Sequence, residues 1–143
     1  MKTKAALLIV LLGLWAHHSD AQTFSPNQLE GTKWKRISPE GGATTTWEFT
    51  KTAIEETAIY FVDRPLTGTR KFYLSMDVPT RFDSTKVGKG ESGKYLVYYI
   101  DKSKRMFYQK IVMLSNDTLK LYKAVEPDAI GGVAHTTIYK KVK

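Results

Sequence analysis

The sequence contains no cysteine, and this absence removes several kinds of chemistry at once. No disulfide can staple the fold, and no thiolate can act as a nucleophile or bind a metal ion. No cysteine follows the N-terminal apolar run either, so we expect that the protein is not a bacterial lipoprotein. A chain without cysteine must rely on its core, and a domain of this length buries about two-thirds of its unfolded surface.

Long hydrophobic runs are also scarce, and the one at the N-terminus is short. Residues 5–16 form an apolar run of 12 residues, whereas a helix that spans a bilayer needs about 20. Lys2 and Lys4 precede the run, and small residues follow it at Ser19 and Ala21. This pattern predicts a signal peptide over residues 1–21 and not a transmembrane anchor. Residues 22–143 would then form one exported domain without a membrane anchor.

The predicted location of the protein is outside the cytoplasm, in the periplasm or outside the cell. Small exported domains of eukaryotes often carry disulfides, so a signal peptide without any cysteine favours a bacterial source. Loss of Lys2, Lys4 and Asp20 leaves 20 basic and 13 acidic side chains, a formal charge of +7.

Histidine is scarce as well. His17 and His18 lie in the predicted signal peptide, which leaves His135 as the one imidazole of the exported domain. One histidine without cysteine cannot assemble the usual zinc, copper or iron ligand sets, so we expect no transition metal and no cofactor. No Gly-x-Ser-x-Gly nucleophile motif occurs, and Glu55 and Glu56 are adjacent, so they point to opposite faces of a strand. A cross-strand pair of Glu48 with Glu56 stays open, but we do not expect an enzyme.

What the sequence does have is a series of short segments rich in β-branched and aromatic residues. No extended helical periodicity interrupts them, and turn-forming residues separate them. The fold class predicted is therefore all-β. We expect strands at residues 33–38, 44–50, 54–62, 69–76, 94–101, 105–114, 118–124 and 133–142, with a short ninth candidate at 81–87.

The connections between these strands are mostly short, as in an antiparallel meander. A meander of about eight strands removes its exposed edges most simply by closing into an up-and-down barrel. We expect Trp34 to be buried, on the face away from Lys33 and Arg36. In the segment 44–50, Trp47 and Phe49 alternate with polar residues and should face the interior.

Three segments resemble the small lipocalin-like domains that Gram-negative bacteria secrete: residues 29–35, 116–121 and 136–141. Lipocalins and fatty-acid-binding proteins share an early Gly-x-Trp. This chain has Gly31 and Trp34 with two residues between them, so it resembles the wider lipocalin-like group and not the strict family. The resemblance implies an antiparallel eight-stranded up-and-down barrel with an apolar lumen and an open mouth.

The aromatic residues suggest one function and the basic residues another. A barrel of eight strands holds packed side chains or one small ligand, and the candidate lumen residues are Trp47, Phe49, Phe61, Tyr99 and Phe107. We therefore expect an exported binding domain for a small apolar or amphipathic molecule. The alternative is a surface module that binds a polyanion, such as an acidic glycan or lipopolysaccharide, through a basic patch of Lys33, Lys35, Lys140 and Lys141.

Overall fold

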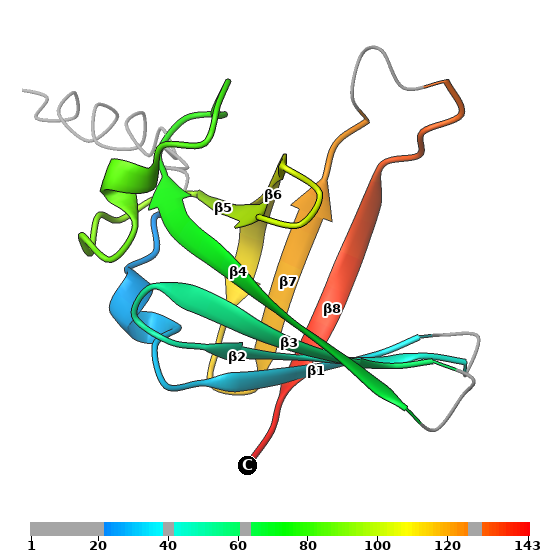
Figure 1. Cartoon of the computed structure of the whole chain (residues 1–143). Helices are drawn as coiled ribbons and strands as arrows, with labels where there is room; N and C mark the ends of the chain where they lie inside the picture. The colour runs from blue at the N-terminus through cyan, green and yellow to red at the C-terminus, as the bar shows by residue number, and fades with distance from the viewer. Residues whose placement is uncertain (1–21, 39–41, 61–63, 126–129) are drawn as a thin grey trace, which may run out of the picture.

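Eight antiparallel strands follow one another around a closed barrel, in a computed structural model that describes residues 22–38, 42–60, 64–125 and 130–143 (Figure 1). The strands are β1 (Lys33–Ile37), β2 (Thr44–Phe49), β3 (Ala53–Ile59), β4 (Pro65–Ser75), β5 (Tyr95–Ile100), β6 (Arg105–Leu114), β7 (Thr118–Lys123) and β8 (His135–Lys141). Each strand pairs with its neighbours in sequence, and β8 pairs with β1. The fold is thus the predicted all-β, up-and-down barrel.

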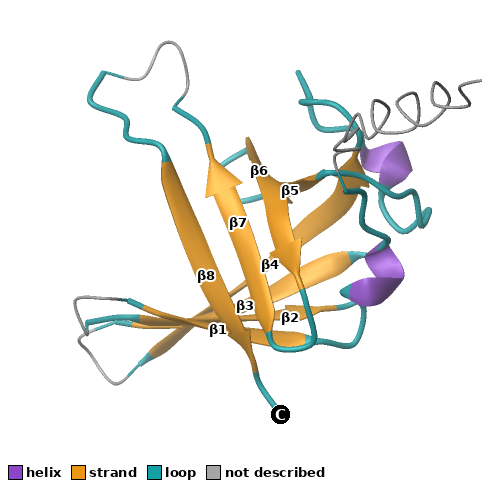
Figure 2. Ribbon diagram, turned by 180° about the vertical axis from the view of Figure 1, so that it is seen from behind, coloured by secondary structure: helices purple, strands orange, loops and turns teal. Residues whose placement is uncertain are grey.

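Two short 3-10 helices lie outside the strands, η1 (Pro26–Gln28) and η2 (Ser84–Lys86) (Figure 2). The strand expected at residues 81–87 was wrong, because the Asp83 side chain caps the turn at η2 by accepting from the backbone N–H of Thr85. The predicted signal peptide, residues 1–21, lies outside the described residues. No helix of the described residues is long and apolar enough to cross a membrane.

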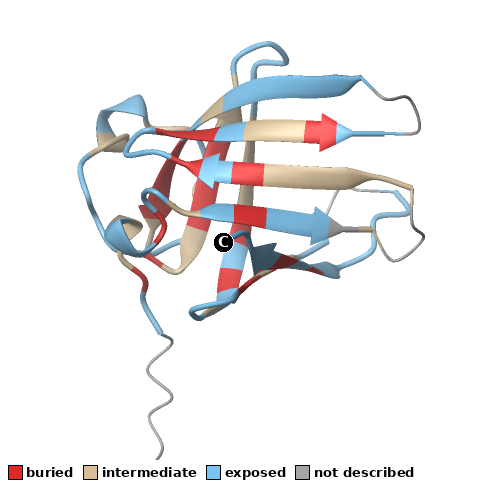
Figure 3. Cartoon of the chain, turned by 90° about the horizontal axis from the view of Figure 1, so that it is seen from below, coloured by how far each residue is buried: buried red, intermediate tan, exposed pale blue. Residues whose placement is uncertain are grey.

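One end of the barrel is packed shut. Leu29, which follows η1 as its C-cap, is fully buried, and Phe24 forms an antiparallel bridge with Gly93 through two backbone hydrogen bonds of 2.8 and 2.9 Å. Apolar side chains from the strands fill this end: Trp34, Phe49, Ile54, Phe72, Leu74, Leu96, Ile111, Leu119 and Leu121. In Figure 3 the buried residues gather toward this end of the strands. We call it the closed end.

Trp34 has the buried position that its place in the sequence predicts. It is 1% exposed, and its indole Nε1 donates a 2.7 Å hydrogen bond to Thr32 Oγ1. The expectation that Arg36 lies on the opposite face was wrong. Arg36 is two residues beyond Trp34 on the same strand, so both side chains point to the interior side of the sheet.

The opposite end is open because the barrel is continuous only near its closed end. β4 pairs with β5 through residues 71–75 and 95–99, so the first six residues of β4 pair with β3 alone. On the other side, β8 pairs with β1 only at Trp34 with Lys141 and Lys35 with Lys140. Strands β1–β4 and strands β5–β8 therefore diverge beyond these two seams, as Figure 1 shows. We call the two groups the N-terminal half and the C-terminal half.

Strand β5 has apolar residues on both faces, and both faces are covered. Leu96 and Tyr98 face the interior, while Val97 is fully buried on the outer side. The cover comes from the connection between β4 and β5, where Phe82 packs against Tyr73 at 5.3 Å between ring centroids. By contrast Ile59, which ends β3, and Tyr60, which follows it, are 42% and 52% exposed.

Candidate ligand-binding site

An open pocket of about 390 Å³ lies between the free part of β4 and the turn that joins β5 to β6. We call it the mouth pocket. Its lining comes from β3, β4 and the β5–β6 hairpin: Glu56, Ala58, Tyr60, Leu66, Thr67, Gly68, Thr69, Arg70, Ile100, Asp101 and Lys102. The pocket exists because the seam between β4 and β5 ends at Lys71 and Tyr99, and the strands separate beyond it.

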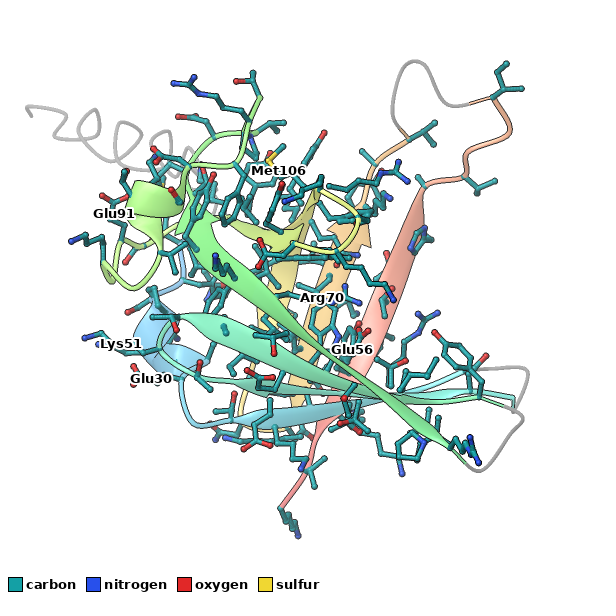
Figure 4. The ribbon with its side chains drawn as sticks, viewed as in Figure 1. Glu30, Lys51, Glu56, Arg70, Glu91 and Met106 are labelled. Atoms are coloured by element: carbon teal, nitrogen blue, oxygen red, sulfur yellow. The ribbon has the colours of Figure 1, made fainter. Side chains whose placement is uncertain are left out.

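Two charged side chains form the floor of the mouth pocket. Glu56 and Arg70 make an ion pair, and the Arg70 Nη2 donates to Glu56 Oε1. Each side chain is only 18% exposed, so the pair is largely removed from bulk water. Figure 4 shows both residues inside the barrel, between the two halves. A charge in such a place is stable only when it is paired and hydrogen-bonded.

The strand register explains why Glu56 faces inward. Trp47 faces the core, and it lies directly opposite Glu56 across the β2–β3 ladder, so the two side chains share a face. The Trp47 Nε1 donates a 2.6 Å hydrogen bond to Glu56 Oε2. Glu55, which precedes Glu56 in the sequence, points outward and accepts a 2.7 Å hydrogen bond from Thr69 Oγ1. The expectation that the two adjacent glutamates point to opposite faces is confirmed.

The cross-strand pair of Glu48 with Glu56, which the sequence left as a possibility, does not occur. Glu48 lies opposite Glu55 on the outer face, and it forms an exposed ion pair of 3.4 Å with Lys33. Among the described residues, no group of three or more His, Cys, Asp or Glu side chains could hold a metal ion. The His135 ring is exposed, with Nδ1 3.4 Å from the carbonyl oxygen of Val133.

An aromatic cluster supports the charged pair from below. Trp47 stacks on Tyr139 at 4.9 Å between ring centroids and meets Tyr98 edge-on at 5.5 Å, while Tyr98 stacks on Phe107 at 5.6 Å. The Arg70 guanidinium lies 5.7 Å from the Trp47 ring and 5.3 Å from the Tyr98 ring. We call these four rings, Trp47, Tyr98, Phe107 and Tyr139, the aromatic cluster.

The surroundings of the two tyrosines are strongly desolvated. Burial raises the pKa of Tyr139 well above its ordinary value of 10.0, and the negative charge that Tyr98 would carry and the charge of Glu56 add to this effect. The Arg36 and Arg70 guanidinium groups oppose it but do not cancel it. Burial likewise raises the pKa of Tyr98, with Arg70 again opposing it. Both phenols therefore stay protonated and neutral at physiological pH.

The five aromatic residues predicted to line the lumen fall into different places. Trp47 and Phe49 face the interior as predicted, but they are 3% and 1% exposed and belong to the packed core, below the mouth pocket. Phe107 is partly buried and packs against the core from the open side. Phe61 lies outside the described residues.

Tyr99 is not a lumen residue. It lies opposite Lys71 across the β4–β5 ladder, on the face away from the core residues Phe72 and Tyr98. Its ring stacks on Phe82 at 5.0 Å, under the connection that covers the outside of β5. Because residues on both faces of β5 are apolar, the alternation of the sequence does not distinguish the inner face from the outer one.

The four lysines of the predicted basic patch do not share one face. Lys35 lies opposite Lys140 on the outer side, and Lys33 is also outward. The Lys140 Nζ donates a 2.6 Å hydrogen bond to Thr118 Oγ1. Lys141 points the other way, with its Nζ 5.8 Å from the Trp34 ring at the closed end. The outer patch is therefore smaller than the sequence suggested.

Sequence reasoning did not identify the charged residues inside the mouth as part of the site.

Fold and site together define an up-and-down β-barrel that is packed at one end and has a charged pocket at the other. In comparisons with protein-family models, curated proteins and solved structures, no match to the chain was found.

Proposed function

We propose that this protein is a binding protein that holds one small amphipathic molecule in the mouth pocket. The observation that carries the proposal is the ion pair of Glu56 and Arg70 at the floor of an open pocket. Pairs of this kind cost desolvation energy, and hydrophobic residues of similar volume often stabilise a core equally well. Their presence beside an open volume favours a role in contacting a ligand.

The volume and chemistry of the pocket support the same proposal. About 390 Å³ is within the usual range of small-molecule sites, roughly 300–1,000 Å³. Ala58, Leu66 and Ile100 offer apolar walls, while Glu56 and Arg70 offer polar contacts at the floor. Such a site matches a molecule with an apolar body and a polar group. A purely apolar ligand, the other form of the sequence-based expectation, would leave the charged floor unused.

The lipocalin-like resemblance and the N-terminal pattern complete the proposal. We propose that the protein belongs with the lipocalin-like barrels and acts after export from the cytoplasm, without catalysing a reaction. Binding of a polyanion to the outer face has less support, because Lys33 pairs with Glu48, Lys140 bonds Thr118, and Lys141 lies on the inner side.

Native mass spectrometry of the protein purified from its own source tests the proposal. The expected spectrum shows a 1:1 adduct whose extra mass is lost when the protein is denatured in organic solvent. The same protein, once stripped, should bind an environment-sensitive dye such as 1-anilinonaphthalene-8-sulfonate with 1:1 stoichiometry. A bare polypeptide mass together with no dye binding would contradict the proposal.

A further inference from the structure

Cationic side chains from both halves of the barrel face into its open mouth. In the N-terminal half, Arg36 lies two residues beyond the core residue Trp34, and Arg70 lies two residues before the core residue Phe72. Residues two apart on a strand point to the same side, so both arginines face inward. Arg70 lines the mouth pocket from β4, whereas Arg36 faces the interior from β1 and is not part of the pocket lining.

The C-terminal half presents its own pair of cations on the opposite wall. Arg105 lies two residues before the core-packed Phe107, and Lys123 lies two residues after the core residue Leu121, so both face inward. The Arg105 guanidinium is 5.7 Å from the Phe107 ring, and the Lys123 Nζ is 5.6 Å from the same ring. Two cations thus flank one aromatic ring at the mouth.

The carboxylates of the described strands do not balance this charge. Within the part of the chain that the structure describes, Glu56 is the strand carboxylate that faces inward, and it is already paired with Arg70. The other ion pairs among these residues, Lys33 with Glu48 and Lys71 with Asp101, use outer or rim side chains. Arg36, Arg70, Arg105 and Lys123 against Glu56 leave a formal excess of three positive charges facing the mouth.

Like charges on two facing walls repel one another, and a low-dielectric wall strengthens the field between them. The rings beside Arg70, Arg105 and Lys123 relieve part of this cost, because a ring face attracts a cation. An anion placed between the walls would relieve it more fully, since it would contact cations from both halves at once.

We propose that the ligand of the mouth pocket carries an anionic head group, which extends from Arg70 in the pocket lining toward Arg36 of the same half and toward Arg105 and Lys123 of the other half. The apolar part of the ligand then lies against Leu66 and Ile100, which line the pocket. This inference rests on the proposed function and adds the sign of the ligand's charge to it. Carboxylates, sulfates and phosphate monoesters share the required chemistry.

Isothermal titration calorimetry with chain-matched probes tests the inference. We expect octanoate, octyl sulfate and octyl phosphate to bind the purified protein at least about tenfold more tightly than octanol or octylammonium, because charge-assisted hydrogen bonds are the stronger ones. The tightest of the three anions identifies the head group. Affinity for the anions should fall as salt is raised.

Charge-removing variants distinguish the inner cations from the net charge of the protein. Arg105→Gln with Lys123→Gln should weaken octanoate binding about tenfold, and Arg36→Gln from the opposite wall should weaken it in the same direction. The matched control is Lys35→Gln with Lys110→Gln, which removes the same charge from the outer face and should leave the affinity unchanged. Far-UV circular dichroism checks that each variant keeps its strands.

The outcomes separate the two proposals. If octanol binds as tightly as octanoate, the inference about charge is overturned while the proposed function stands. If the control variant loses as much affinity as the inner variants, the anion responds to net charge and the site is overturned. If none of the probes binds, the proposed function fails and this inference fails with it.

Discussion

Trp47 and Glu56 lie directly opposite each other across the β2–β3 ladder, and the indole Nε1 donates a 2.6 Å hydrogen bond to the carboxylate. The indole itself is 3% exposed and packs against Tyr98 and Tyr139. A core side chain therefore fixes the position of the carboxylate that holds Arg70 at the floor of the mouth pocket. Core packing and the chemistry of the site are thus connected through one hydrogen bond.

Replacing Glu56 by Gln should destabilise the fold. The change leaves the Arg70 guanidinium without its counter-charge while both side chains are 18% exposed, so the expected loss is about 2 kcal/mol of the free energy of unfolding. The measurement is urea denaturation. The control is Glu48→Gln, which breaks an ion pair with side chains 49% and 56% exposed and should cost under about 1 kcal/mol. Equal losses in both variants would contradict the assignment.

Stability at high pH should report the burial of Tyr139. Its folded-state pKa lies above 10.0, so between that value and the folded pKa the folded chain keeps a proton that the unfolded chain has lost. The contribution of the protonated Tyr139 to the free energy of unfolding is therefore complete below about pH 10, and it is lost as the pH rises toward the folded-state pKa. The free energy of unfolding, measured from about pH 9 to pH 11, should fall less steeply in Tyr139→Phe than in the wild type.

The control for this experiment is Tyr122→Phe, because Tyr122 is 37% exposed on the outer face of β7. It should show the same pH dependence as the wild type. If the free energy of unfolding falls with pH as steeply in Tyr139→Phe as in the wild type, the buried phenol does not contribute to alkaline unfolding.

Adding a single methyl group at Gly93 should disturb the closed end. A Cβ there would lie 2.4 Å from the backbone nitrogen of Ser75, so the backbone would have to shift. The bridge between Gly93 and Phe24 would shift with it. We expect Gly93→Ala to cost about 1–3 kcal/mol in urea denaturation, as overpacking does. Gly68→Ala is the control, since nothing lies within 4 Å of its Cβ, and it should cost little or nothing.

Much of the fold could be predicted because local patterns determine it. Residues 44–50 alternate polar and aromatic side chains, and Trp47 and Phe49 face the core as this alternation requires. Short turns between neighbouring strands favour an antiparallel meander, and the barrel closes as expected. The 3-10 turn at η2 was missed because a side-chain cap, not strand propensity, determines the conformation there.

The site was harder to predict because it depends on the pairing of strands distant in sequence. The sequence left a cross-strand pair of Glu56 with Glu48 open, although Ile54 and Ala58, two residues away from Glu56 on either side, are apolar and buried. That local signal places Glu56 on the inner face. Its partner Arg70 is 14 residues away and meets it only through the β3–β4 ladder, where Ile54 lies opposite Arg70. The seams that create the pocket leave no signal in any single segment.

The most direct test of the central claim fills the mouth pocket without disturbing the core. Gly68 lies opposite Glu56 on the inner face of β4, it lines the pocket, and a Cβ there meets open space. A Gly68→Phe substitution should therefore occupy the pocket while the barrel keeps its stability. The matched control, Thr136→Phe, adds a ring on the outer side of β8, where Thr136 is exposed.

The measurement is a fluorescence titration of each protein with 1-anilinonaphthalene-8-sulfonate, with urea denaturation to confirm that both variants are folded. We predict 1:1 binding by the wild type and by Thr136→Phe, and binding at least about tenfold weaker by Gly68→Phe, because the inserted ring takes the volume that the ligand needs. A folded Gly68→Phe protein that binds the dye as tightly as the wild type would contradict the claim that the mouth pocket is the binding site.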